Sequence, residues 1–180
     1  MKISKKALSA KLNDVLRPER LHSIREAFLD TWPEARAYLE IHARLCSHGQ
    51  TACVEQYYSK RIRGGLKYSE ACNTRFQGII ADAAKSAGWA LSREMYTGTS
   101  VLRGSRIVNF PHDEFIVEVP EPIGHECAQA IQEIVLREVG KYLPDVPPKA
   151  LPYLARYWSK KGFPIVKDGK LTPWNGEKKV

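Results

Sequence analysis

Apolar residues recur at helical spacing in the first part of the chain, where they predict a series of helices. A short basic helix is expected over residues 5–15 and a second helix over residues 19–29. A third helix is expected after Thr31–Glu34, which has the form of a capping box with proline in the first turn. Its apolar stripe would consist of Ala37, Leu39, Ile41 and Leu45. The second and third helices are expected to form an αα-hairpin.

Two longer helices are predicted further along the chain. Over residues 69–96 the apolar positions form one stripe of a long amphipathic helix. Another helix is expected to start at Pro120–Pro122, to reach about Tyr142 and to pack across a sheet. Asn73 and Gln77 are four residues apart in the first of these helices, and therefore lie one turn apart on one face.

The β pattern is clearest at Ser105–Pro120, where two runs rich in Ile, Val and Phe are separated by Pro111–Asp113. Such runs suit a half-buried pleated surface, and the polar break suits the reversal of a hairpin. Further extended or turn segments are expected at Gln50–Lys60 (a strand or strand pair), Lys60–Lys67 (a basic loop), Ala150–Trp158 (an edge strand) and Asp168-Gly169 (a tight turn). The predicted fold class is therefore α+β, with an antiparallel β-sheet packed against long amphipathic helices.

Composition narrows the class of protein without selecting one function. With 180 residues the chain is long enough for one domain with a core, and its net charge of +8 favours an anionic partner such as nucleic acid. Ribosomal and membrane-surface proteins share this charge. No apolar run approaches a membrane span and no signal peptide is recognisable, so a cytoplasmic location is expected.

The four cysteines lack CxxC spacing and are expected to be reduced. The intervals among His42, Cys46, His48 and Cys53 match no recognised zinc finger.

The tip of the predicted hairpin carries the residues with the clearest candidate chemistry, His112, Asp113 and Glu114. Two adjacent carboxylates beside an imidazole form half of a site for a hard divalent cation, which takes carboxylate and phosphate oxygens. The alternative is that Asp113 and Glu114 are solvated turn residues, as most such pairs at turns are.

This tip and the long helix together resemble the C-terminal palm region of family A DNA polymerases, the DNA polymerase I type, and most closely its phage-like members. The family pattern is Asn, three variable residues, Gln-Gly, two variable residues, Ala-Asp and then Lys, followed by a β-hairpin that bears His-Asp-Glu. The sequence matches this pattern at Asn73, Gln77, Gly78, Ala81, Asp82, Lys85, His112, Asp113 and Glu114. The resemblance implies that the antiparallel sheet is palm-like. It also implies that the protein works in a bacterial or phage-infected cell.

The resemblance also implies roles for individual residues. Asp113 and Glu114 would be carboxylate ligands of a two-Mg²⁺ site for nucleotidyl transfer, and His112 would help to position the primer terminus. Asn73 and Gln77 would contact the minor groove of primer–template DNA, where acceptors on every base pair make contact nearly independent of sequence. In the arginine-rich neighbourhood upstream, the candidates for contact with the DNA backbone are Arg61 and Arg63.

The resemblance covers only part of a polymerase of this family. Residues 1–48 would be the helical segment that follows the fingers, because Arg25–Arg36 is similar to that segment, and residues 49–180 would be the C-terminal part of the palm. Neither the other catalytic Asp of the family nor its nucleotide-binding fingers helix is found. The isolated chain is therefore expected to be inactive.

Three interpretations of such a chain stay open. In the first, a second polymerase chain supplies the fingers, the thumb and the missing Asp. In the second, the chain is a non-catalytic fragment that binds duplex DNA. In the third, the acidic tip serves a metal-dependent phosphodiesterase.

Overall fold

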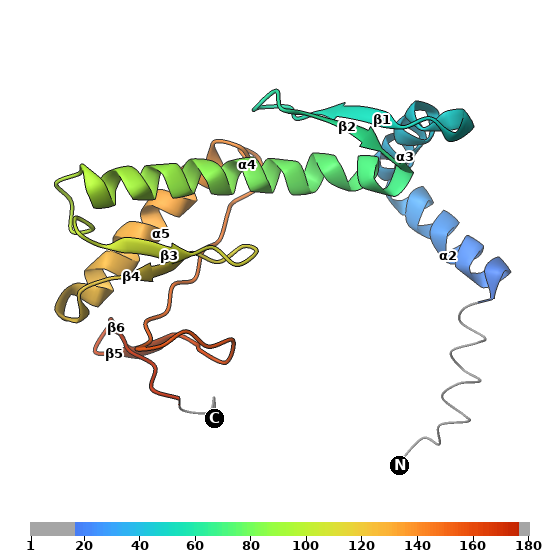
Figure 1. Ribbon diagram of the computed structural model, residues 1–180. Coiled ribbons are helices and arrows are strands. Elements are labelled where there is room, and N and C mark those ends of the chain that lie inside the picture. Colours follow the sequence, from blue (N-terminus) through green and yellow to red (C-terminus); the bar gives the residue numbers. More distant parts are fainter. Residues whose placement is uncertain (1–16, 177–180) are drawn as a thin grey trace, which may run out of the picture. The chain divides into compact units, whose positions relative to one another are not determined.

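The computed structural model describes residues 17–176, which form two compact units (Figure 1). The first unit contains the described residues up to Glu55 together with Arg61–Arg75, and the second contains Gln56–Lys60 and the described residues from Phe76 onward. Helix α4 (Tyr68–Tyr96) begins in the first unit and ends in the second. The helix predicted over residues 5–15 lies outside the described residues.

The first unit begins with two helices, α2 (Pro18–Thr31) and α3 (Pro33–Leu45), which confirm the two predictions for this part of the chain. Each helix has proline in its first turn. Proline lacks an N–H, and this costs nothing there because the N–H groups of the first turn have no partner within the helix. The helices contact each other, and the guanidinium of Arg36 on α3 donates to Glu26 and Asp30 of α2 at 3.0 and 2.7 Å.

The capping box predicted at Thr31–Glu34 is wrong. The N-cap of α3 is Trp32, which makes no side-chain capping hydrogen bond. The Thr31 hydroxyl instead donates to the carbonyl of Ala27 at 2.8 Å. Because α2 continues through Thr31, this side chain bonds back to its own helix and is not available to the next one.

The β-structure of the first unit is a two-stranded sheet. A short 3-10 turn, η1 (Ser47–Gly49), leads to β1 (Ala52–Glu55), which pairs antiparallel with β2 (Ile62–Leu66). The strand expected within Gln50–Lys60 is confirmed by β1. The small core of this unit consists of Ala52, Val54, Leu66 and Ala71 of α4.

The basic loop predicted at Lys60–Lys67 is wrong, because most of it forms β2. Glycine weakens a strand on its own, and it is tolerated where another chain segment approaches closely. Such an approach occurs here, since a Cβ on Gly64 would lie 3.2 Å from Sγ of Cys53.

The core of the second unit lies where α4, the hairpin of β3 (Arg106–Asn109) and β4 (Ile116–Glu118), and α5 (Gly124–Gly140) meet. The 3-10 turn η2 (Glu121–Ile123) lies between the hairpin and α5 in the chain. The buried residues at the centre are Leu91, Met95, Leu102, Cys127 and Ile134, and the hairpin adds Ile107, Phe115 and Val117. Both long helices and the hairpin were predicted, and the structure confirms them.

The C-terminal part of the second unit contains another hairpin, β5 (Ile165–Lys167) and β6 (Lys170–Thr172). The tight turn predicted at Asp168-Gly169 is confirmed, because both residues have positive φ, 49° and 76°, as a type I′ turn requires. The edge strand predicted at Ala150–Trp158 is wrong. Only an isolated bridge between Ala155 and Trp174 occurs there.

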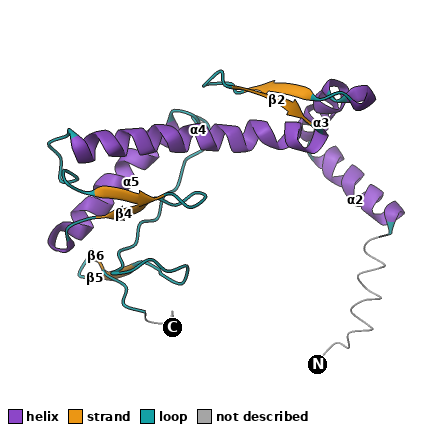
Figure 2. Cartoon of the chain, viewed as in Figure 1, coloured by secondary structure: helices purple, strands orange, loops and turns teal. Residues whose placement is uncertain are grey.

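The α+β class is confirmed, and the strands of the described residues pair in antiparallel fashion (Figure 2). They form three separate two-stranded sheets, whereas one continuous sheet was expected. No helix in residues 17–176 is both long enough and apolar enough to cross a membrane.

Candidate nucleic-acid interface

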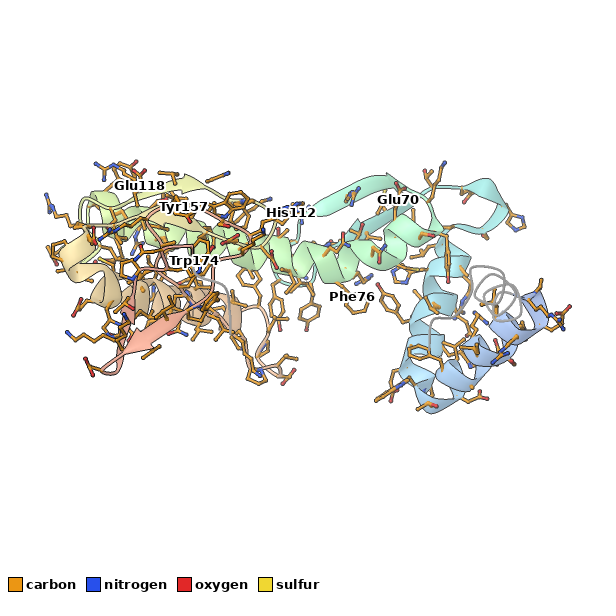
Figure 3. The ribbon with its side chains drawn as sticks, turned by 90° about the horizontal axis from the view of Figure 1, so that it is seen from below. Glu70, Phe76, His112, Glu118, Tyr157 and Trp174 are labelled. Atoms are coloured by element: carbon orange, nitrogen blue, oxygen red, sulfur yellow. The ribbon has the colours of Figure 1, made fainter. Side chains whose placement is uncertain are left out.

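The hairpin between β3 and β4 presents the predicted acidic residues on a tight turn. The N–H of Glu114 donates to the carbonyl of Pro111 at 3.1 Å, which closes a turn with His112 and Asp113 at its centre. His112 has a positive φ of 58°, in the left-handed region that primed hairpin turns use. It lies at the free end of the hairpin, whereas Glu118 lies at the base (Figure 3). The structure thus confirms the predicted turn, and His112, Asp113 and Glu114 lie on it.

The two carboxylates of the tip have different surroundings. Glu114 is half-buried, and its oxygens accept hydrogen bonds from the Tyr153 hydroxyl at 3.3 Å and from the Trp158 indole N–H at 3.4 Å. Burial, and then the negative charge of Glu114, raise the pKa of Tyr153, so the phenol stays protonated and can donate. Glu114 is therefore restrained by the segment around residues 153–158.

Asp113 is the carboxylate left available for a ligand. It is exposed, and no described residue forms a hydrogen bond or an ion pair with it. Carboxylate oxygen suits a hard cation such as Mg²⁺, which binds through one or two carboxylates together with water and substrate phosphates. Residues 17–176 contain no cluster of three or more His, Cys, Asp or Glu that could hold a metal ion. Asp113 and Glu114 are the two carboxylates that the turn presents, one exposed and one held by Tyr153 and Trp158.

One face of α4 carries an exposed stripe, which consists of Gln77, Ala81 and Lys85 at intervals of four residues. Asn73 is exposed one turn earlier on the same helix, in the part that belongs to the first unit. An interval of four keeps side chains on neighbouring turns of one face. The α4 stripe therefore combines an amide, a small residue and a cation on an exposed surface.

Two other residues of the polymerase-like pattern, Gly78 and Asp82, are buried, and they hold residues 56–60 against α4. The side chain of Gln56 is 1% exposed and lies so close to Gly78 that a Cβ there would meet it at 2.2 Å. One turn later the buried Asp82 accepts a hydrogen bond from the Ser59 hydroxyl at 2.5 Å. Gly78 and Asp82 thus dock Gln56–Lys60, and they leave the α4 stripe uncovered.

Replacing Gly78 by Ala should destabilise the second unit by about 1–2 kcal/mol. The atoms in the way are the amide end of the Gln56 side chain, which is 1% exposed and has little room to move, so overpacking outweighs the gain of about 1 kcal/mol that alanine brings to a helix. In a Gln56→Ala background the same change should become stabilising, because the obstructing side chain is gone. Urea denaturation of the four proteins of this double-mutant cycle tests the contact, and stabilisation by Gly78→Ala alone would contradict it.

The hairpin is seated on the same face of α4 as the stripe. A Cβ on Gly88 would lie 3.3 Å from Cε1 of Phe115, so the Phe115 ring packs directly on the helix there. Gly88 follows Gln77 by eleven residues, which at 100° per residue places the two within about 20° of each other around the helix and about 16 Å apart along it. Within the second unit, His112 at the tip lies nearer to Phe76 than Glu118 at the base does (Figure 3).

The two predicted backbone-contacting arginines belong to the first unit. Arg63 on β2 is exposed, and its guanidinium donates to the Thr74 hydroxyl on α4 at 3.3 Å. Arg61 is half-buried just before the strand. The structure places these arginines with Asn73 in one unit, and places Gln77 with the hairpin tip in the other.

Comparison of the chain with protein-family models, with curated proteins and with solved structures finds no match. What the site can do therefore follows from its own residues. Within the second unit, an available carboxylate and a restrained one lie on a turn whose hairpin packs on the face that carries Gln77 and Lys85. Amide and ammonium groups suit the grooves and phosphates of a duplex, and carboxylates suit a metal that holds phosphate oxygens.

Sequence reasoning missed the two residues that hold Glu114. Tyr153 and Trp158 lie within the segment that was predicted as an edge strand, and a strand prediction gives no reason to connect them with a distant turn. The available signal was the group of aromatic residues Tyr153, Tyr157 and Trp158 in the sequence. In the structure Tyr157 packs against Trp174, and Tyr157 and Trp158 both stay about half exposed. Exposed aromatic side chains next to a polar turn are a reason to look for a shared site.

Proposed function

We propose that this chain is the C-terminal palm portion of a template-directed DNA polymerase, that it binds primer–template DNA, and that it contributes carboxylates to two-metal nucleotidyl transfer. A second chain would supply the fingers, the thumb and the other catalytic Asp, and the isolated chain would be inactive. One observation carries the proposal. The hairpin with the His-Asp-Glu tip packs on the same face of α4 on which Gln77 and Lys85 are exposed.

The α4 stripe has the chemistry to bind a duplex without reading its sequence. The amide of Gln77 both donates and accepts, so it can bond to minor-groove acceptors that every base pair presents. Lys85 can contact a backbone phosphate, and Ala81 between them leaves room for the sugar edge. The 16 Å or so between Gln77 and Gly88 is roughly the rise of five base pairs of B-DNA. A duplex on this stripe would therefore extend toward the hairpin tip.

The tip would act at the primer end of that duplex. Bound Mg²⁺ ions would stabilise the charge that develops during phosphoryl transfer. Asp113 would be the bridging ligand because its carboxylate is available. Glu114, held by Tyr153 and Trp158, would be a nearby or outer carboxylate. His112 at the free end of the hairpin would help to position the primer terminus.

A non-catalytic duplex-binding protein is the second candidate. It is favoured by the engagement of Glu114, which leaves one available carboxylate at the tip, and by the net charge of +8. This candidate keeps the DNA-binding role of the α4 stripe and removes the metal chemistry. A metal-dependent phosphodiesterase would keep the metal chemistry at Asp113.

We expect Gln77→Ala to weaken binding of a primer–template duplex about threefold to tenfold, which corresponds to one net hydrogen bond. Fluorescence anisotropy with labelled duplexes of unrelated sequence measures the effect, which should be the same for each sequence. Affinity should fall steeply with salt, because phosphate contacts release counterions. The matched control is Gln129→Ala, which removes an exposed glutamine from α5 of the same unit.

Equal affinities for the Gln77→Ala variant, the Gln129→Ala variant and the unchanged chain would remove the α4 stripe from the DNA-binding surface. Strong dependence on duplex sequence would also contradict the proposal, since a polymerase must accept any primer–template. Cleavage of the duplex by the chain alone, abolished in Asp113→Asn, would support the phosphodiesterase instead.

A further inference from the structure

A cavity of about 280 Å³ between α4 and α5, remote in sequence from the hairpin tip, carries a second concentration of charge. It is lined by Ser86, Trp89, Ala90, Arg93 and Glu94 of α4 and by Arg137, Glu138 and Lys141 from the end of α5 onward. Three cations and two carboxylates leave it with one net positive charge. Nothing in the proposed polymerase role uses these residues.

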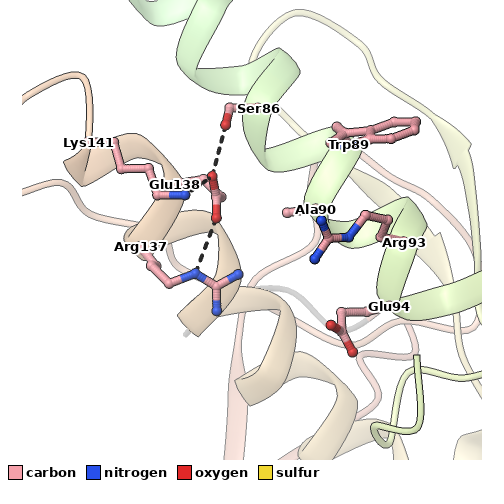
Figure 4. Close-up of a pocket in the computed structure, with 8 residues that line it drawn as sticks. All are labelled: Ser86, Trp89, Ala90, Arg93, Glu94, Arg137, Glu138 and Lys141. Atoms are coloured by element: carbon pink, nitrogen blue, oxygen red, sulfur yellow. Dashed lines mark hydrogen bonds and ion pairs between the residues drawn. The ribbon is translucent and has the colours of Figure 1, made fainter. Parts of the chain in front are cut away.

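Glu138 is buried and anchors the α5 side of the cavity. Its carboxylate accepts from Ser86 Oγ at 2.8 Å, from Lys141 Nζ at 2.6 Å and from Arg137 Nε at 3.2 Å (Figure 4). These partners, Lys141 first, lower the pKa of Glu138, which is therefore ionised at neutral pH. With three donors and two neighbouring cations, the charge of Glu138 is compensated within the protein.

Two guanidinium groups remain directed into the cavity. Arg137 uses only Nε for Glu138, and its other nitrogens face Arg93, whose guanidinium extends toward it from α4 (Figure 4). Within the described part of the chain the Arg93 guanidinium makes no ion pair. Arg137 is paired with Glu138 through Nε alone, so an anion between the two guanidinium groups could contact the remaining nitrogens of Arg137 and those of Arg93. The planar forks of arginine match the oxygens of a phosphate.

An aromatic ring lies at the rim of the same cavity. Trp89 is 69% exposed and lies one turn before Arg93 on α4. Its indole turns outward, away from Glu138 (Figure 4). A phosphate group in the cavity and a flat ring on this indole would therefore be neighbouring parts of one ligand. The cavity is smaller than the 300 Å³ or so at which pockets begin to enclose whole ligands.

From these observations we infer that the cavity and Trp89 form a site for single-stranded nucleic acid, with a backbone phosphate between Arg93 and Arg137 and an adjacent base stacked on the indole of Trp89. Aromatic stacking beside a basic groove is the usual way in which proteins hold a single strand without regard to sequence. The site belongs to the second unit alone, and it does not depend on the proposed polymerase role.

The test is titration of the whole chain with a short oligothymidylate, followed by tryptophan fluorescence and by anisotropy of the labelled strand. Binding should quench the fluorescence. Trp89→Ala should abolish most of the quenching and weaken binding about tenfold, because stacking of one base is lost. Arg93→Gln should weaken binding by a similar factor without disturbing Glu138. Lys167→Gln is the control that removes the same charge, since Lys167 is exposed on β5, whose partner strand β6 contacts the other end of α5 through Lys170 and Glu126.

Three results would overturn the inference. One is unchanged binding in Arg93→Gln and Trp89→Ala variants that retain the helical circular dichroism of the unchanged chain. Another is an equal loss in Lys167→Gln, which would show that only net charge matters. The third is equally tight binding of thymidine monophosphate, which would make this a mononucleotide site. Because Gln77→Ala should leave oligothymidylate binding unchanged, failure here and failure of the duplex-binding proposal are distinguishable.

Discussion

Asp113→Asn is expected to reduce primer extension about a thousandfold when the chain is combined with a polymerase piece that carries the fingers, the thumb and the other catalytic Asp. A metal-bridging carboxylate stabilises the transition state by several kcal/mol, and about 4 kcal/mol corresponds to this factor. Asparagine keeps the size of the side chain and removes its charge. Because Asp113 is exposed and makes no hydrogen bond with a described residue, the substitution should leave stability unchanged.

The assay is extension of a labelled primer by the reconstituted pair, with each component alone as the baseline. Asp145→Asn provides the matched control, since Asp145 is exposed in the loop after α5 and has no place in the proposed site. Duplex binding by Asp113→Asn should equal that of the unchanged chain, which separates catalysis from binding. Extension that survives Asp113→Asn would exclude this residue as a metal ligand, and would leave duplex binding as the function that the α4 stripe supports.

Local signals in the sequence predicted most elements of the fold. The helical period over residues 69–96 predicts α4 almost to the residue, because a long stripe of apolar positions is hard to produce otherwise. The hairpin at Ser105–Pro120 and the tight turn at Asp168-Gly169 carry their own turn chemistry within a few residues. Each of these elements is specified by neighbours in the chain.

The errors concern structure that depends on distant neighbours. Residues 62–66 read as a basic loop because Gly64-Gly65 is a poor strand signal, yet β1 provides a partner that makes the strand favourable. Ala150–Trp158 alternates like a strand, yet in the structure it finds no partner strand along its length and makes only the bridge to Trp174. A strand is stabilised by its pairing, and pairing partners are not visible in a local pattern.

In the candidate site, too, the features set by nearby residues were predicted and those set by distant residues were not. The turn at His112 and the exposed face of Gln77 follow from local periodicity and turn signals, so both were predicted. The restraint on Glu114 comes from Tyr153 and Trp158, which are 39 and 44 residues away in the chain. No spacing rule connects side chains at such separations. The cavity between α4 and α5 likewise depends on which turns of two helices meet, and this is decided by packing.

Leu91→Ala is expected to lower the free energy of unfolding of the second unit by about 3 kcal/mol, the usual cost of a cavity left by a fully buried leucine. Leu91 is 0% exposed at the centre of the core that joins α4, the β3–β4 hairpin and α5. A two-stranded hairpin is only marginally stable by itself, so the tip residues keep their geometry because this core holds the strands. The loss should therefore appear as faster amide hydrogen exchange in β3 and β4.

The matched control is Ile80→Ala on the same helix, where the side chain is 48% exposed and the cost should be about 1 kcal/mol or less. Urea denaturation gives the two free energies, and hydrogen exchange read by NMR locates the change, with β1 and β2 of the first unit as the internal reference. Equal effects of Leu91→Ala and Ile80→Ala would mean that Leu91 is not in the core. The hairpin tip would then lack the packed support that a metal site needs, because ligands that shift by an ångström no longer hold two ions and a primer terminus in line.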